Sequence, residues 1–385
     1  MGLYTAAVSE PVIVVDDAIS HATQALAGLG RLHCLPAVDI TGERLAALRA
    51  ALLVVRSVTR VDASLLDCAR QLRFVGTATA GTDHLDIPAL AARGIAVASA
   101  AGCNARAVAE WVVGALAFVE HQLPEPVRCG PVGVVGFGNV GSRLTPLLRR
   151  LGHEVLVCDP PLARRGAQAE AFVSFSELWR RCPIVSFHVP LIHEGRDATW
   201  AYVDRESPAV AGPKLLINTS RGGVIRERAL DRPDVVAAIL DVWDGEPALA
   251  PARLSDPRLL LASPHVAGYS LEAKLAATRM MHEAVCAQLG RAPSWTGQDA
   301  LPRVLATSKD PSSLLEVNDF IDFVGDDARV RALAGLPGPA RAAAFEQLRR
   351  GYQLRREFRS WRIPRERAPA PKLQAWLQTV GFELT

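Results

Sequence analysis

The sequence of 385 residues predicts an α/β protein with two doubly wound parallel sheets, followed by a small C-terminal region. Two observations lead to this class. Short β-branched runs alternate with helical stretches, as strands joined by crossover helices do. A long, mostly apolar helix divides these runs into two series, and each series predicts a sheet of its own.

The predicted elements can be placed in chain order. The first series of strands comprises Val12–Asp17, Leu52–Arg56, Leu72–Thr79 and Ile95–Ser99. The dividing helix begins at the Asn104 cap and ends before Pro124. The apolar runs of the second series lie near Gly133, Val157, Val185, Ile217 and Ile239. A further helical run extends from Leu271 to Leu289 and ends this part of the chain.

The chain after this helix has a different composition. Pro, Gly and Ser punctuate the stretch between Arg291 and Ser313, which indicates a domain boundary. The remaining tail is rich in arginine and poor in β-branched runs, so we expect a small helical or α+β appendage. Its arginines alternate with apolar residues, which favours a homodimer surface over RNA binding. These apolar residues are Phe345, Leu348, Tyr352, Leu354, Phe358 and Trp361.

Composition narrows the function. A hydrophobic content of 49% excludes disorder, and 43 Lys+Arg against 40 Asp+Glu leave a net charge of +3, which indicates neither a nucleic-acid nor a membrane partner. The seven cysteines are odd in number and contain no CxxC pair, which argues against disulfides and structural zinc. The N-terminus lacks a signal-peptide pattern, and no apolar run approaches the roughly 20 residues of a membrane-spanning helix. We therefore expect a cytoplasmic protein that binds a small molecule and no metal.

A glycine-rich loop predicts a dinucleotide site. Gly136, Gly138 and Gly141 form a GxGxxG fingerprint between an apolar run and an amphipathic helix, the context that a pyrophosphate-binding turn requires. The next strand ends at Asp159, eighteen residues beyond Gly141, where a carboxylate can hold the ribose hydroxyls. That carboxylate would repel a 2′-phosphate, so NAD is favoured. Two basic residues close by leave NADP open: Arg164 and Arg165.

Three further residues follow predicted strands of the second series. Arg221 lies in NTSRGG, Glu246 in LDVWDGEP and His265 in SPHVAGYS. Because ligands collect at the carboxyl ends of an open parallel sheet, we expect these side chains to share one site. An arginine can grip the carboxylate of a 2-hydroxy acid bidentately. A histidine paired with a carboxylate can exchange the hydroxyl proton during hydride transfer, so all three are predicted to be catalytic.

Together with the glycine loop, these residues resemble the D-isomer-specific 2-hydroxyacid dehydrogenase family from about Val12 to Leu289. In that family the motif Arg, Glu and His are catalytic, in agreement with the chemistry above. The resemblance implies a Rossmann-type NAD-binding domain inserted into a flavodoxin-like substrate domain. It implies a substrate domain at 1–104 and 266–290, an NAD-binding domain at 105–265 and a separate C-terminal domain at 291–385.

A narrower match, to one branch of the family, is carried by the segments VVRSVTRVDASLL, FVGTATAGTDHLD and HVAGYSLEAK and by the tail AGLPGPARAAAFEQLRRGYQLRREFRSW. These are similar to enzymes of vitamin B6 (pyridoxal 5'-phosphate) biosynthesis that use NAD to oxidise 4-phospho-D-erythronate to 2-oxo-3-hydroxy-4-phosphobutanoate. The tail of that branch is a dimerisation domain. The resemblance implies substrate contacts at Ser57, Thr79 and Tyr269. It implies cofactor contacts at Asn139, Val140, Asp159, Val189, Thr219, Ser220, Arg221, Asp241 and Gly268.

Two of these cofactor positions depart from the branch. Val189 replaces a more usual Thr, and Thr219 with Ser220 stand where an Ala-Cys pair is expected. Both positions border the cofactor and not the proton-transfer pair, so the departures bear on cofactor affinity.

The substrate phosphate needs a donor beyond the catalytic residues. Arg56 stands at a predicted strand end beside Ser57, where a guanidinium and a hydroxyl can face one ligand. Arg56 is therefore the predicted phosphate contact. His84, in TDHLD, is expected to pack beside the substrate loop.

Two other functions stay open at this point. A dehydrogenase acting on phosphoglycerate, glyoxylate or another small 2-oxo acid would share the glycine loop and the three catalytic residues, but the tail and the RSVT segment argue against it. A non-catalytic NAD-sensing scaffold would share the fold. The intact Arg221, Glu246 and His265 argue against the scaffold.

Overall fold

The computed structural model describes residues 10–168, 170–208, 212–297, 300–301, 303–305 and 316–385. The N-terminal start, 1–9, and much of the predicted boundary stretch before Ser313 lie outside the described residues. The chain forms two compact units. The first comprises Met1–Asn104 and Leu271–Pro302, and the second comprises Ala105–Ser270 and Arg303–Thr385.

The first unit is a five-stranded parallel sheet in the order β2-β1-β3-β4-β5, the flavodoxin-like order. Its strands are β1 (Val12–Asp16), β2 (Arg31–Leu35), β3 (Leu52–Val55), β4 (Phe74–Thr77) and β5 (Ala96–Ser99). Its helices are α1 (Ala22–Leu26), α2 (Gly42–Leu48), α3 (Ala63–Cys68), α4 (Ile87–Ala92) and α12 (Leu271–Gln288).

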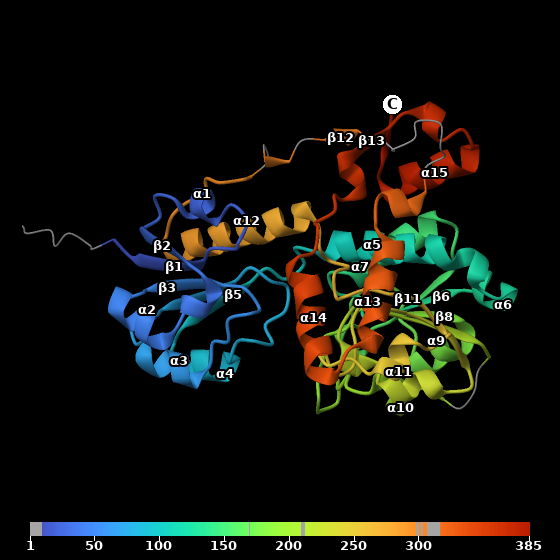
Figure 1. Ribbon diagram of the computed structural model, residues 1–385, viewed down its shortest axis with the longest axis horizontal. Coiled ribbons are helices and arrows are strands. Elements are labelled where there is room, and N and C mark those ends of the chain that lie inside the picture. The colour runs from blue at the N-terminus through green and yellow to red at the C-terminus, as the bar shows by residue number, and fades with distance from the viewer. Residues whose placement is uncertain (1–9, 169, 209–211, 298–299, 302, 306–315) are drawn as a thin grey trace, which may run out of the picture. The chain divides into compact units, whose positions relative to one another are not determined.

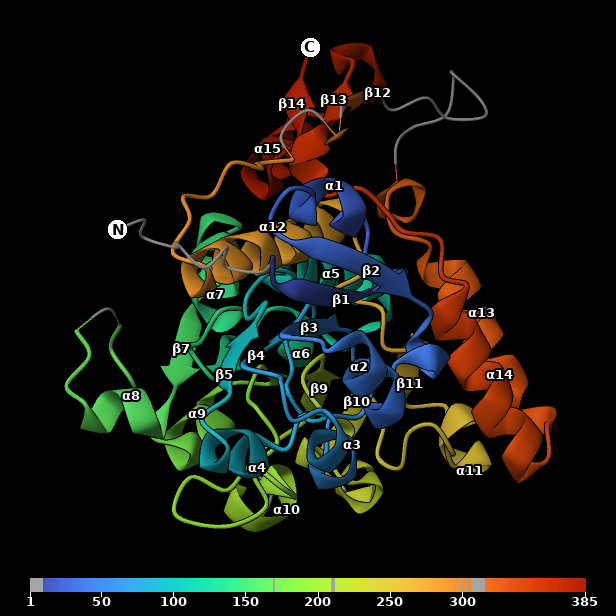
Figure 2. The ribbon, with the colours of Figure 1, turned by 90° about the vertical axis from the view of Figure 1, so that its left-hand side faces the viewer.

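Helices cover both faces of this sheet, because side chains of a strand point alternately to its two sides. Val12 and Val14 belong to a core with residues of α2 and α3. Ile13 and Val15 belong to a second core with residues of α1 and α12. Figures 1 and 2 show α1 and α12 on one face of the sheet and α2 and α3 on the other. The near-continuous apolar run of β1 is thus explained by burial on both faces.

The second unit contains a six-stranded parallel sheet in the order β11-β10-β9-β8-β6-β7. Its strands are β6 (Val132–Val135), β7 (Val155–Cys158), β8 (Ile184–Phe187), β9 (Lys214–Asn218), β10 (Val235–Leu240) and β11 (Leu259–Ala262). Its helices before residue 271 are α5 (Ala105–Val119), α6 (Glu125–Arg128), α7 (Gly141–Arg150), α8 (Pro160–Arg164), α9 (Phe175–Arg181), α10 (Tyr202–Glu206) and α11 (Pro251–Leu254). This is the predicted Rossmann-type arrangement.

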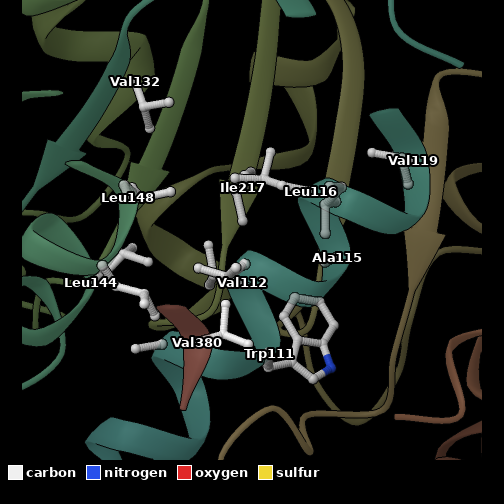
Figure 3. Packing of buried hydrophobic residues seen from close by; sticks show 14 of the residues in the cluster. Trp111, Val112, Ala115, Leu116, Val119, Val132, Leu144, Leu148, Ile217 and Val380 are labelled. Carbon is white, nitrogen blue, oxygen red and sulfur yellow. The ribbon is translucent and has the colours of Figure 1, made fainter. Parts of the chain in front are cut away.

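The dividing helix α5 is the centre of the larger core. Figure 3 shows its residues Trp111, Val112 and Leu116 lying with Leu148 of α7 and Ile217 of β9. Nearly every residue of α5 is buried, which explains why the sequence is apolar around the whole helix.

The C-terminal segment packs within the second unit. Its regular elements are α13 (Phe323–Ala332), α14 (Gly338–Arg350), α15 (Pro371–Val380) and a parallel sheet of β12 (Val304–Leu305), β13 (Trp361–Ile363) and β14 (Glu383–Leu384). The rings of Phe323 and Trp111 meet edge to face at 5.5 Å, and Phe358 and Val380 share the α5 core.

This packing differs from the expected division into three domains. The segment from Arg303 belongs to the second unit because its aromatic side chains complete the core around α5. The boundary near the end of the inserted part falls after Ser270 and not after His265. Each structural unit thus has a core built from two stretches of chain.

Short 3₁₀ helices connect the main elements. They are η1 (Ala37–Asp39), η2 (Glu120–Gln122), η3 (Gly222–Val224), η4 (Glu227–Asp231), η6 (Val317–Asp319), η7 (Leu333–Gly335), η8 (Phe358–Ser360) and η9 (Arg365–Arg367). Among the described residues, no helix combines the length and the apolar character needed to cross a membrane.

Candidate active site

One edge of the six-stranded sheet gathers the site residues of the second unit. All six strands run parallel, so their carboxyl ends meet at the same edge. Each strand is followed there by predicted site residues: Gly136 after β6, Asp159 after β7, Val189 after β8, Thr219 to Arg221 after β9, Asp241 and Glu246 after β10, and His265 after β11.

The glycine loop has the geometry of a pyrophosphate turn. Gly136 has a φ of +93°, and a Cβ there would lie 2.5 Å from the His188 carbonyl oxygen. A Cβ at Gly141 would lie 1.9 Å from the Gly136 carbonyl oxygen, whereas one at Gly138 would meet nothing within 4 Å. The first and third glycines therefore permit the turn and its close packing, and the second leaves the backbone open to a ligand.

Asp159 lies directly beside this loop. Its Oδ2 accepts a hydrogen bond from the Phe137 N–H at 2.8 Å, and its Oδ1 caps α8 through the Leu162 N–H at 3.0 Å. The carboxylate is thus held at the strand end where ribose hydroxyls are bound in such folds. Arg164, one of the two basic residues that kept NADP as an alternative cofactor, is paired with Asp197. These residues fit NAD.

The β9 loop is held by Asn218. Its Oδ1 accepts hydrogen bonds from the Ser220 N–H at 3.1 Å and the Ser220 hydroxyl at 2.8 Å, and its Nδ2 donates to the Arg221 carbonyl oxygen at 2.9 Å. The Arg221 guanidinium donates through Nη1 to the Ser220 carbonyl oxygen at 2.8 Å. Arg221 is half-buried, so its guanidinium is shielded and still able to reach a ligand.

Glu246 and His265 form the predicted pair. Glu246 Oε2 lies 2.8 Å from His265 Nδ1, and Glu246 Oε1 accepts the Trp243 N–H at 2.8 Å. Because an ionised carboxylate only accepts hydrogen bonds, Nδ1 carries the hydrogen and Nε2 is left as the basic nitrogen of the neutral ring. The loops after β10 and β11 thus supply a histidine whose orientation and tautomer are set by a carboxylate.

Charge reinforces this pairing. Burial pushes the pKa of Glu246 upward, but the His265 charge and the hydrogen bonds from His265 and Trp243 outweigh it and leave this pKa below its usual value. Glu246 therefore remains a carboxylate, the form that stabilises an imidazolium.

Asp241 holds the histidine loop in place. His265 has a left-handed φ of +60°, which few residues other than glycine adopt. The buried Asp241 Oδ1 accepts the Val266 N–H at 2.7 Å, the Ala267 N–H at 3.0 Å and the Ser263 hydroxyl at 2.6 Å. Asp241, predicted only as a cofactor contact, is thus also the anchor that keeps His265 in this conformation.

His188, a further histidine of the second unit, differs from His265. His188 lies after β8, with Nε2 2.9 Å from the Ser186 hydroxyl and Nδ1 3.2 Å from the Thr219 hydroxyl. Loss of water around the imidazole lowers the pKa of His188 to about 3, so it stays neutral. Its neighbour Val189 packs against the turn at Gly136.

The predicted substrate residues of the first unit also follow strand ends. Ser57 is exposed in the turn after β3, and Thr79 lies after the neighbouring β4, where its hydroxyl bonds Thr77 at 2.8 Å and the Gly81 carbonyl oxygen at 3.0 Å. Arg56 donates through Nε to the buried Asp16 at 3.0 Å. His84 bonds the Thr77 hydroxyl through Nε2 at 3.0 Å, as a packing residue would.

Sequence reasoning missed a contribution from the C-terminal segment. Tyr269, a predicted substrate contact four residues after His265, meets the Tyr352 ring edge to face at 6.0 Å. The charge of Arg349 acts on both Tyr269 and Glu246. No local motif marks Arg349 or Tyr352, because both sit in a tail that is generally rich in arginine and aromatic residues.

The donor types in the site fit an organic cofactor better than a metal ion. Within the part of the chain that the structure describes, no three His, Cys, Asp or Glu side chains are grouped closely enough to hold a metal. A dinucleotide turn, a guanidinium and a His–Glu pair together define a nicotinamide-dependent dehydrogenase of small hydroxy acids.

Comparison with known proteins agrees with this class. The family model for the D-isomer specific 2-hydroxyacid dehydrogenase NAD binding domain matches residues 110–267. The fold is shared with D-lactate dehydrogenase from Aquifex aeolicus, complexed with NAD and lactic acid (TM-score 0.56, 20% identity, 72% of this chain and 95% of that one). It is also shared with NAD+-bound 3-phosphoglycerate dehydrogenase of Entamoeba histolytica (TM-score 0.57, 22% identity, 73% and 94%).

Relatives that match nearly the full length of the chain define its family within this class. Erythronate-4-phosphate dehydrogenase of Azotobacter vinelandii is 40% identical over 96% of this chain and 99% of its own. The protein of the same name from Salinibacter ruber is 38% identical over 97% and 98%. The chain therefore belongs to the erythronate-4-phosphate dehydrogenase family and is an NAD-dependent D-2-hydroxyacid dehydrogenase.

Proposed function

We propose that this protein oxidises 4-phospho-D-erythronate to 2-oxo-3-hydroxy-4-phosphobutanoate with NAD, a step of pyridoxal 5'-phosphate biosynthesis. The observation that carries the proposal is the His265–Glu246 pair, at 2.8 Å, beside the strand end that holds Arg221. The names of the full-length relatives support the choice of substrate.

The proton of the substrate hydroxyl passes to His265. Nδ1 is occupied by Glu246, so Nε2 is the nitrogen that accepts the proton from the C2 hydroxyl during oxidation and returns it during reduction. Glu246 stabilises the imidazolium that forms and keeps the ring oriented. When bound, NAD accepts the hydride that leaves C2.

Arg221 orients the substrate for this step. Its guanidinium can bind the carboxylate and the C2 oxygen as a fork, which holds C2 in one position relative to the His265 ring. We assign the adjoining contacts to Ser57, Thr79 and Tyr269, and the cofactor contacts to the glycine loop with Asn139, Val140, Asp159, Val189, Thr219, Ser220, Asp241 and Gly268.

Arg56 remains a candidate for the substrate phosphate. Its Nε is taken by Asp16, so only its Nη groups are available for a ligand. Arg56→Lys would keep a cation for Asp16 and lose the guanidinium fork. If Arg56 binds the phosphate, this variant weakens the binding of 4-phosphoerythronate by about 1.5–3 kcal/mol and leaves the binding of unphosphorylated erythronate unchanged. Equal losses for both substrates would assign Arg56 to the fold.

The proposed activity is tested by following NADH absorbance with 4-phospho-D-erythronate and NAD, with a 2-oxo acid added to reoxidise tightly held NADH. Phosphoglycerate, glycolate and D-lactate serve as the panel. A preference for 4-phosphoerythronate supports the proposal, whereas a preference for another acid indicates a different branch of the family. NADH binding with no turnover on any acid would indicate a scaffold.

We also propose a cytoplasmic homodimer formed through the C-terminal segment. Phe345 and Phe358, which suggested that surface, are buried within their own chain, so the dimer needs other apolar contacts. Val324 and Leu336 of this segment are 57% and 38% exposed and offer such contacts. A variant that carries both Val324→Asp and Leu336→Asp should be a monomer when its mass is measured by light scattering. A monomeric wild-type protein would refute the dimer.

A further inference from the structure

The C-terminal segment is anchored beside the candidate active site. Asp327 of α13 accepts the Ala262 N–H at the end of β11 at 2.8 Å, and Arg331 donates to the Leu254 carbonyl oxygen at 3.1 Å. Val330 and Phe345 share a core with Leu240 of β10. Helices α13 and α14 are therefore fixed against the two strands whose ends carry Glu246 and His265.

The chain that leaves α14 continues along the histidine loop. Tyr352 donates to the buried Asp326 Oδ2 at 2.9 Å and presents its ring edge to face to Tyr269. Three residues later, Arg355 forms a β-bridge with Ser270. The segment that follows α14 thus runs beside Tyr269 and Ser270.

Arg349 lies in the last turn of α14 and is only partly paired. Its side chain is 22% exposed, and Nη1 donates to Glu346 at 3.3 Å. Its Nε is buried and has no hydrogen-bond partner among the described residues. Because this Nε has no accessible surface, a ligand can reach Arg349 only through its Nη groups, which belong to the partly exposed end of the side chain.

The charges around Arg349 leave its cation incompletely neutralised. Glu246 is occupied by His265 and the Trp243 N–H, and Asp241 by the histidine loop. Glu346, at 41% exposure, is the one carboxylate that pairs directly with Arg349 among the described residues, and water weakens that pair. The charge of Arg349 reaches Glu246 strongly enough to help lower the pKa of that carboxyl group.

We propose that Arg349 forms a phosphate subsite of this active site and selects substrates that carry a phosphoryl group at the end opposite the carboxylate. The inference rests on the proposed function. Arg221 would take the carboxylate, while the Nη groups of Arg349 would donate hydrogen bonds to the phosphate oxygens. Arg349 contacts no reacting atom, so its role is specificity.

The test compares two neighbouring arginines of α14. Arg349→Gln should lower kcat/KM for 4-phosphoerythronate by about 10- to 100-fold, mainly through KM, because the contact is present equally in the ground and transition states. Its kcat/KM for D-erythronate should change by less than about threefold. The matched control is Arg350→Gln, which removes an exposed arginine one residue away and should change neither value.

Further measurements separate a binding role from a structural one. Arg349→Lys keeps the charge without the planar guanidinium and should retain part of the preference for the phosphorylated substrate. Equal losses of kcat/KM for 4-phosphoerythronate and D-erythronate would refute the subsite. Calorimetric titration of the NADH-loaded enzyme with inorganic phosphate gives a readout without turnover. Binding that is lost in Arg349→Gln and kept in Arg350→Gln supports the subsite even if 4-phosphoerythronate proves a poor substrate. Unchanged phosphate binding in Arg349→Gln would refute it even if the proposed activity is confirmed.

Discussion

His188 and His265 follow two strands of the same sheet, yet their surroundings suit them to different tasks. His188 contacts two hydroxyl groups and has a pKa lowered to about 3, whereas His265 contacts the carboxylate of Glu246 at 2.8 Å. A hydroxyl partner satisfies a neutral ring, and a carboxylate partner also stabilises the charged one. Burial keeps His188 neutral, whereas the carboxylate beside His265 stabilises the protonated ring and suits this histidine to exchange a proton.

The largest effect is expected from His265→Ala. Removing a positioned acid–base group should lower kcat about 10²- to 10⁴-fold while NADH affinity stays nearly unchanged. Steady-state rates and NADH fluorescence titration measure the two quantities. Near wild-type turnover would show that His265 is not the acid–base group and that its role does not differ from that of His188.

Glu246→Gln should have a smaller effect. Losing a charge-assisted hydrogen bond worth about 1.5–3 kcal/mol should lower the rate about 10- to 100-fold. The amide no longer favours the imidazolium, so the limb of the pH–rate profile that reports the base should move to lower pH. A profile at the wild-type position would show that Glu246 supports the fold only.

His188→Gln should change stability more than activity. Its two hydroxyl partners would be imperfectly satisfied, which should cost about 1–3 kcal/mol of unfolding free energy in a denaturant titration. The kcat should stay within about threefold of wild type because His188 exchanges no proton. A loss of kcat as large as that of His265→Ala would contradict the division of roles.

The effect that is smallest near neutral pH is the acid sensitivity that His188 confers. The unfolded chain takes up a proton there near the ordinary value of 6.5, but the folded protein does so only near 3. The unfolded state therefore binds more protons in this window, and stability is complete above about pH 6.5 and falls as the pH is lowered towards 3. Relative to wild type, His188→Gln should remove a slope of up to about 1.4 kcal/mol per pH unit. Parallel stability curves for the two proteins would mean that His188 is protonated when folded.

Much of the inserted domain could be predicted because its signals are local. The strand runs near Gly133, Val157 and Ile217 appear as β6, β7 and β9, and the dividing helix appears as α5. Strand β2 was missed, and the strand before His265, which is β11, was expected without being assigned its residues. Both are edge strands, and β2 carries partly exposed polar residues such as Arg31 and His33 that weaken the apolar signal.

The sequence by itself determined which residue types stand at which strand ends, because the carboxyl edge of a parallel sheet collects them whatever the loops do. Gly136, Asp159, Arg221, Glu246 and His265 could be placed at one edge for that reason. Only the tertiary structure decided that Phe345 and Phe358 are buried in their own chain and that Tyr352 contacts Tyr269. An amphipathic pattern specifies that a face is covered but not by what, and contacts between residues far apart in sequence depend on packing that no local motif encodes.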